Sequence, residues 1–101
     1  GTSAEDSIRS YYVDKAFVSC KAFDRERGIM DSNELFAHAK QVMMNSAKTS
    51  ILAVDHSKFD NTAFSRVVNT QNLSAVVTDV KPSQEWMEYF ATRNIKCYYP
   101  E

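Results

Sequence analysis

Four short apolar runs, separated by segments with helical spacing, constrain the fold of this chain more than any other feature of its sequence. The runs lie at Lys15–Cys20, Ser50–Val54, Ser74–Thr78 and Ile95–Tyr99. An almost unbroken run of apolar residues is typical of a strand that is covered on both faces. Because strands and helices alternate along the chain, the sequence predicts an α/β fold with a mostly parallel sheet of about four strands, flanked by helices.

Apolar residues at helical spacing mark the segments between these strands. The clearest stripe lies within Ser32–Ala47 and consists of Leu35, Phe36, Ala39, Val42 and Met43. A short helix is expected over Ala4–Tyr12. Another is expected from Pro82 to Asn94, since asparagine tolerates the left-handed conformation that often ends a helix. The segment Ala63–Val68 fits either a single helical turn or an edge segment.

A charged loop and a single glycine precede the Ser32–Ala47 helix. The loop is Lys21–Arg27, and Gly28 is the only glycine after residue 1, which indicates a backbone position that needs glycine's freedom. Asp31 and Glu34 have the spacing of a capping box at a helix start. Because the free N–H groups and dipole at a helix start attract anions, this stretch is a candidate site for a small anion.

Polar residues follow three of the predicted strands, at Lys21–Asp24, Asp55–Lys58 and Asp79. In open parallel sheets, ligands bind beyond the carboxyl ends of the strands. The three polar segments would therefore line one pocket at a common edge. The alternative is that they are polar only because such loops face water.

Two blocks of the sequence resemble a known family. The first comprises Asp14–Lys21, Phe23-Asp24, Gly28-Ile29 and Asp31–Glu34, and the second is Asp55–Phe59. They resemble the C-terminal effector-sensing domain of DeoR-type bacterial transcriptional regulators, and the likeness covers most of the chain. The resemblance implies a fold related to sugar-phosphate isomerases and CoA transferases. It also implies a ligand-sensing function, in which a phosphorylated sugar or related metabolite controls a separate DNA-binding domain.

The resemblance also implies which residues bind the effector. They are Lys21, Asp24, Gly28, Asp31, Asn33, Glu34, Lys40, Asp55 and Lys58. Lys58 would meet a phosphate or pair with a neighbouring acid, whereas Lys40 and Glu34 would equally suit the surface of a helix. Three residues depart from the family's usual pattern, namely Ala22 for glycine, Met30 for threonine and His38 for glutamate. These departures bear on the identity of the effector more than on the existence of a pocket.

The charge balance bears on the expected partners. Twelve Lys and Arg against thirteen Asp and Glu give a formal net charge of −1, which provides no basic field for a phosphodiester backbone. DNA binding is therefore expected only through a helix-turn-helix domain outside residues 1–101, which would form a single, partial effector domain. Because such regulators read two half-sites as dimers, a homo-oligomer is expected. No apolar run predicts a membrane helix, so the expected location is cytoplasmic, without membrane contact.

The main alternative function is a fragment of a sugar-phosphate isomerase-like enzyme. In that case Asp24 or Glu34 would act as the base and Lys58 as the group that polarises the carbonyl. A lone Gly28 does not supply the glycine-rich phosphate loop of those enzymes. A binding module is therefore the preferred interpretation, and the chain is not expected to be an enzyme.

Metal and nucleophile sites are not predicted. Asp55, His56 and Ser57 are the residue types of a catalytic triad, but neighbours in sequence cannot adopt its geometry with one another. The two histidines lack zinc-ligand spacing with either cysteine. Cys20 and Cys97 are expected to be buried thiols, and no cofactor is expected.

Overall fold

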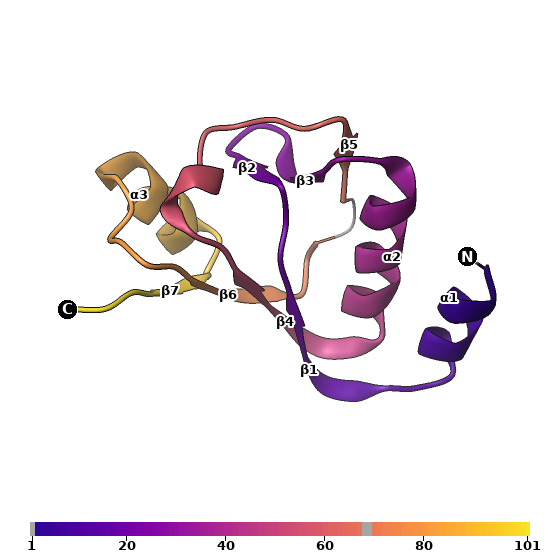
Figure 1. The fold of residues 1–101 in the computed structure, drawn as a ribbon. Helices are drawn as coiled ribbons and strands as arrows, with labels where there is room; N and C mark the ends of the chain where they lie inside the picture. Colours follow the sequence, from indigo (N-terminus) through magenta and orange to yellow (C-terminus); the bar gives the residue numbers. More distant parts are fainter. Residues whose placement is uncertain (1, 68–69) are drawn as a thin grey trace.

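The computed structural model describes residues 2–67 and 70–101. Its main sheet is parallel and contains four strands in the order β1 (Val13–Val18), β4 (Ala47–Ala53), β6 (Leu73–Val77) and β7 (Lys96–Tyr98) (Figure 1). The other elements are α1 (Thr2–Arg9), β2 (Ala22–Asp24), β3 (Gly28–Asp31), α2 (Glu34–Asn45), the 3-10 helix η1 (His56–Lys58), β5 (Ser65–Arg66) and α3 (Gln84–Thr92). The predicted fold class is confirmed. Within the described residues, no helix is long and apolar enough to span a membrane.

The start of α2 differs from the predicted capping box. Asn33 is the N-cap, and its side-chain oxygen accepts a hydrogen bond from the Phe36 N–H at 2.8 Å. Asp31 is instead the last residue of β3, where its carboxylate accepts from the Ser32 N–H at 2.9 Å and pairs with Lys40. The prediction that Asp31 and Glu34 cap the helix is therefore wrong, because the Asp31 carboxylate pairs with Lys40 instead.

We expect Asn33→Ala to lower the free energy of unfolding by about 1 kcal/mol, because it removes the acceptor for a free N–H in the first turn of α2. Urea denaturation followed by circular dichroism measures the change. Ser32→Ala is the matched control, since Ser32 is exposed and adjacent but does not cap the helix. Equal losses in the two variants would contradict the assignment of the cap.

The charged segment predicted as a loop contains a β-hairpin. β2 and β3 pair antiparallel, and β5 adds to β3 to complete a second sheet. The Asp24 carboxylate accepts from the N–H groups of Glu26 at 3.0 Å and Arg27 at 2.8 Å, which folds the turn. Gly28 follows the turn and has φ +79°, a positive value of the kind that its isolated occurrence predicted. The loop prediction is thus wrong for the part that forms β2.

Other element boundaries shift by a few residues. α1 ends at Arg9, before the predicted end of this helix at Tyr12. The segment that the sequence left open forms the short edge strand β5, while Val68, at the end of that segment, lies outside the described residues. Asn94 adopts the left-handed conformation expected at the end of α3, with φ 58°.

An aromatic cluster holds the hairpin, η1 and α3 together. Phe23 of β2 is 1% exposed, and its ring centroid lies 4.7 Å from that of Trp86 and 6.0 Å from that of Phe59. The cluster continues into the face of the main sheet formed by Val18, Leu52 and Val76. The hairpin is therefore fixed against α3 and the sheet, not free as a surface loop would be.

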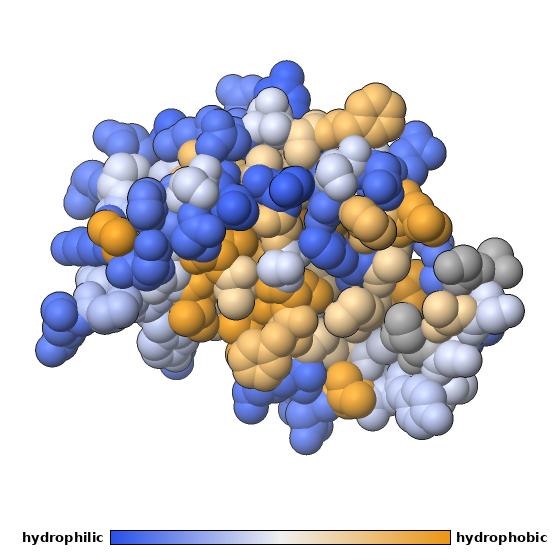
Figure 2. Space-filling view, viewed as in Figure 1, coloured by the Kyte–Doolittle hydropathy of each residue, from blue (hydrophilic) through white to orange (hydrophobic). Residues whose placement is uncertain are grey.

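The opposite face of the main sheet is open in the described structure. Strand order follows chain order, and crossovers of one hand, as parallel sheets have, then all lie on one side of the sheet. Figure 1 shows α2, the small sheet and α3 on one side. On the open face Phe17 is 64%, Val77 42% and Tyr98 52% exposed. Figure 2 shows apolar residues at the surface in this region. The prediction that the strands are covered on both faces is wrong for the described residues.

Candidate functional site

The carboxyl ends of β1, β4 and β6 meet at one edge of the main sheet. Phe17 pairs with Ile51 and Ala53 with Val77, so the segments that follow these three strands are neighbours. Cys20 and Lys21 follow β1, Asp55 to Lys58 follow β4, and Asp79 follows β6. This arrangement brings together three polar segments that are far apart in the sequence.

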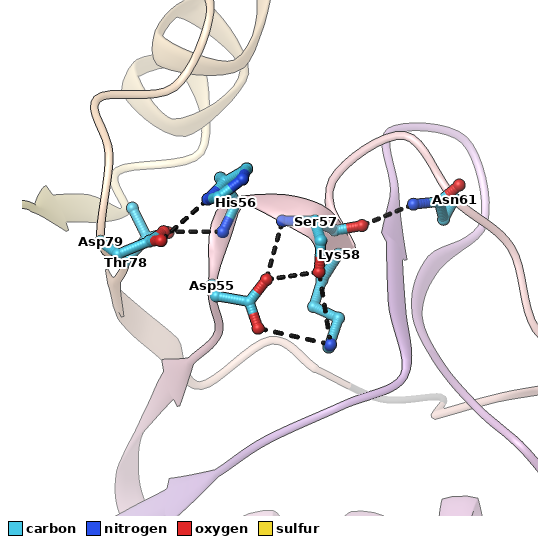
Figure 3. A network of polar contacts seen from close by, with 7 residues as sticks. All are labelled: Asp55, His56, Ser57, Lys58, Asn61, Thr78 and Asp79. Atoms are coloured by element: carbon cyan, nitrogen blue, oxygen red, sulfur yellow. Dashed lines mark hydrogen bonds and ion pairs between the residues drawn. The ribbon is translucent and has the colours of Figure 1, made fainter.

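Asp55 organises the segment that follows β4. Its carboxylate caps η1 by accepting from the Ser57 N–H at 2.8 Å and from the Ser57 hydroxyl, and it lies 3.4 Å from Lys58 Nζ (Figure 3). The bonds from Ser57, supported by Lys58, lower the pKa of Asp55 to about 2. The Asn61 amide donates to the Ser57 carbonyl at 2.6 Å. Asp55 is therefore an anion, held in one position, over the physiological pH range.

Asp79 fixes the same segment to the end of β6. One of its oxygens accepts from the His56 N–H at 2.7 Å, and the other lies 2.8 Å from His56 Nδ1 (Figure 3). Hydrogen bonding to Asp79 raises the pKa of His56, and the same bond lowers the pKa of Asp79. The pair thus joins two strands' ends and sets the position from which Asp55 and Lys58 project.

We expect the His56–Asp79 pair to make stability depend on pH. Because the pKa of His56 is higher in the folded state than in the unfolded state, its protonation stabilises the folded chain. This contribution is complete below the unfolded-state pKa of His56 and is lost as the pH rises through its folded-state pKa. The lowered pKa of Asp79 acts at the acid end, where its contribution is lost as the pH falls through the folded value. Between about pH 6 and 8, the melting temperature should therefore fall more in the parent chain than in His56→Gln. Identical pH profiles would exclude the pair as a stabilising contact.

Asp31 and Lys40 form a second ion pair, between the small sheet and α2. The side chain of Asp31 is 6% exposed and that of Lys40 is 22% exposed. Because Asp31 ends β3 and Lys40 lies on α2, the pair connects the small sheet to the helix. Lys40 is therefore a partly buried cation whose charge is balanced by Asp31, and not only a surface charge of the helix.

Cys20 follows β1 at this edge and is 6% exposed. Burial raises the pKa of its thiol to about 11, with smaller electrostatic effects from Lys40, Asp31 and Lys58. Charges of both ion pairs thus act on this thiol, those of Asp31 and Lys40 from one pair and that of Lys58 from the other.

The other predicted ligand-binding residues have different surroundings. Asp24 holds the hairpin turn, Gly28 lies beside it, and Asn33 caps α2. Glu34 borders a separate hollow with His38 and Arg66. Lys21 is exposed at the end of β1, where its N–H donates to the Met30 carbonyl at 3.1 Å. Asp24, Gly28, Asn33 and Glu34 therefore belong to the turn, the start of α2 and a separate hollow, whereas Lys21 lies at the edge directly after Cys20.

The residues that depart from the family pattern are mostly packing residues. Ala22 pairs with Met30 across the hairpin, and the two are 1% and 4% exposed. His38 Nε2 lies 3.3 Å from the Glu5 carboxylate, so it connects α2 to α1. Sequence reasoning missed the His56–Asp79 contact, although the aspartate two residues after β6 was a signal for it. The described part of the chain contains no cluster of three or more potential metal ligands among His, Cys, Asp and Glu.

Comparison with known proteins supplies the family. Residues 1–80 match the sequence model of the DeoR C terminal sensor domain. An uncharacterized HTH-type transcriptional regulator, YulB, of Bacillus subtilis (strain 168) is 42% identical over 79 residues, which cover 78% of this chain and 31% of that protein. A putative aga operon transcriptional repressor of Escherichia coli O157:H7 is 32% identical over 79 residues, covering 78% and 29%. The deoxyribose operon repressor of Escherichia coli (strain K12) is 28% identical over 95 residues, covering 94% and 38%.

These similar proteins are transcriptional regulators, and the chain spans about a third of the length of each. The match to the sensor-domain model covers β1 to β6, including Cys20, both ion pairs and the His56–Asp79 contact. The chain belongs to the family of DeoR C terminal sensor domains.

Proposed function

We propose that this sensor domain binds a phosphorylated sugar at the carboxyl edge of its parallel sheet. The observation that carries the proposal is that polar segments after β1, β4 and β6 share that edge, and that the segment after β4 holds the ionised Asp55 3.4 Å from Lys58 Nζ. The Asp31–Lys40 pair and Lys58 both act electrostatically on Cys20, which follows β1. A sugar phosphate offers an anion for the lysines and hydroxyl groups for the carboxylates. The name of one similar regulator, the deoxyribose operon repressor, refers to a sugar and is consistent with this ligand class.

The two ion pairs suit different parts of such a ligand. The Lys58 side chain is 31% exposed and its 3.4 Å contact with Asp55 is loose, so a phosphate can approach its ammonium group. Lys21, exposed at the end of β1, supplies a second cation. Asp55 stays ionised and can accept hydrogen bonds from sugar hydroxyls. We assign the Asp31–Lys40 pair to holding β3 and α2 beneath the ligand.

Thermal unfolding in the presence of phosphorylated deoxyribose, hexose and amino sugars tests the proposal. A ligand at about 100 times its dissociation constant stabilises the folded chain by roughly 2.7 kcal/mol. Lys58→Gln should remove most of this shift, whereas Lys48→Gln, which removes an exposed lysine from β4, should retain it. If no sugar phosphate shifts the melting temperature, or if both variants respond alike, the assignment fails.

We further propose that the chain is part of a larger effector domain of a cytoplasmic, homo-oligomeric regulator. Coverage of about a third of each similar regulator supports a longer parent protein. DNA would be bound by a separate helix-turn-helix domain, and the effector would shift the regulator between two states by its differential affinity for them. Light scattering of the parent regulator, with and without the effector, tests the oligomer.

A further inference from the structure

A cleft runs between the β2–β3 turn and the C-terminal end of α3. It consists of two adjoining hollows of about 480 and 390 Å³ that share Gly28, Thr70, Tyr89 and Arg93. Its apolar floor contains Phe23, Ile29, Leu73 and Ile95. Leu73 begins β6 and Ile95 precedes β7, so the cleft reaches the amino ends of these strands. It is therefore distinct from the candidate effector site at the carboxyl edge.

Four arginines from three elements line the cleft. Arg25 and Arg27 come from the β2–β3 turn, Arg66 from β5 and Arg93 from the end of α3. Glu26 is the only acidic residue among the described lining residues. The chain as a whole has a formal net charge of −1, so this concentration of positive charge is local. Four guanidinium groups that repel one another favour the binding of an anion between them.

Protein carboxylates only partly balance these arginines. Arg25 lies 3.9 Å from Asp60 and Arg27 lies 3.9 Å from Asp24, which are long contacts for ion pairs. The Asp24 carboxylate already accepts two N–H groups of the turn. Across residues 2–67 and 70–101, no carboxylate lies within ion-pair distance of Arg66 or Arg93. An incoming anion would therefore not have to displace a strong internal pair.

Arg93 is held in place beside the apolar floor. Its guanidinium carbon lies 3.6 Å from the centroid of the Tyr89 ring, and Nη1 donates to the Tyr89 carbonyl at 3.3 Å. Stacking on an aromatic ring positions the planar guanidinium group with less loss of side-chain freedom on binding. Because both described bonds of Arg93 use Nη1, its Nε and Nη2 groups can donate to a ligand.

We propose that this cleft binds a small organic phosphate. The phosphate meets the arginines of the rim, since guanidinium groups bind phosphate oxygens in pairs. The ring or apolar body of the ligand lies on the floor formed by Ile29, Leu73 and Ile95. This inference does not depend on the sugar-phosphate site, because the two sites share no predicted ligand-binding residue other than Gly28.

Calorimetric titration with phenyl phosphate tests the proposal, because this compound has a phosphate and a ring. Inorganic phosphate lacks the ring and benzyl alcohol lacks the charge. We expect binding of phenyl phosphate that weakens with added salt, weaker binding of inorganic phosphate, and none of benzyl alcohol. Arg66→Gln and Arg27→Gln should each weaken binding about tenfold. Both arginines are exposed, so these changes should leave the melting temperature nearly unchanged.

Lys48→Gln is the control and should bind phenyl phosphate as the parent chain does, whereas Lys58→Gln reports on the carboxyl edge. Loss of binding in Lys58→Gln would place the ligand at the carboxyl edge and overturn the proposal. Equal affinity in the parent chain and in both arginine variants would also overturn it. The proposal also fails if no binding is detected up to about 10 mM phenyl phosphate. It fails as well if the arginine variants weaken the binding of duplex DNA and leave that of phenyl phosphate unchanged.

Discussion

Replacing Phe23 with alanine should lower the free energy of unfolding by about 3 to 5 kcal/mol, the range for removing a buried aromatic side chain. Phe23 is 1% exposed, and its ring lies beside Phe59, the residue that ends η1, and Trp86 of α3. The cavity would open where three elements meet, so neighbouring residues cannot close it without moving the hairpin. Because domains of this size have total stabilities of about 5 to 15 kcal/mol, the variant would retain little reserve.

Urea denaturation of Phe23→Ala, Phe23→Leu and Phe64→Ala measures this effect. Phe64 is the matched control because it is the same residue type but 78% exposed, so its loss should cost less than about 0.5 kcal/mol. Phe23→Leu keeps most of the buried volume and should fall between the other two. A loss for Phe23→Ala as small as that for Phe64→Ala would show that the hairpin is not anchored by this ring.

The parallel sheet was predictable because its signal is local. Each strand carries its own apolar run, and the amphipathic stripe of α2 lies between two of them. The β2–β3 hairpin was not predicted, because its strands contain only three and four residues and adjoin the charged turn Arg25–Arg27. Phe23 alone cannot reveal a strand. Its burial depends on Trp86, which is far along the chain.

The candidate site was predictable only in part, for a related reason. An aspartate after each of β4 and β6 could be read from the sequence, but the contact between His56 and Asp79 requires these strands to be neighbours. Strand order is a property of the whole fold. The Asp31 capping prediction failed in the same way, because local spacing cannot show that Lys40 takes the carboxylate. Local signals thus located the polar segments, and tertiary contacts assigned their roles.

Breaking the Asp31–Lys40 pair should be the other severe change. Asp31→Asn leaves the Lys40 ammonium group, in a side chain only 22% exposed, without its counter-charge. Loss of one partner from a buried pair costs about 3 to 5 kcal/mol, and the residual solvent contact of Lys40 places the expected loss near the lower limit, about 3 kcal/mol. Urea denaturation measures it. Asp14→Asn, at an exposed position on β1, is the control.

A double-mutant cycle separates loss of the pair from loss of packing. Because Lys40→Met removes the charge that Asp31→Asn leaves unpaired, the double variant should be more stable than Asp31→Asn alone. If the losses of unfolding free energy in the two single variants add up in the double variant, the side chains act independently. That result would contradict the close contact between them in the structure. Restored stability would not by itself restore function. If the pair holds β3 and α2 in a particular arrangement beneath the effector, the double variant should fold but respond less to the sugar phosphate that stabilises the parent chain.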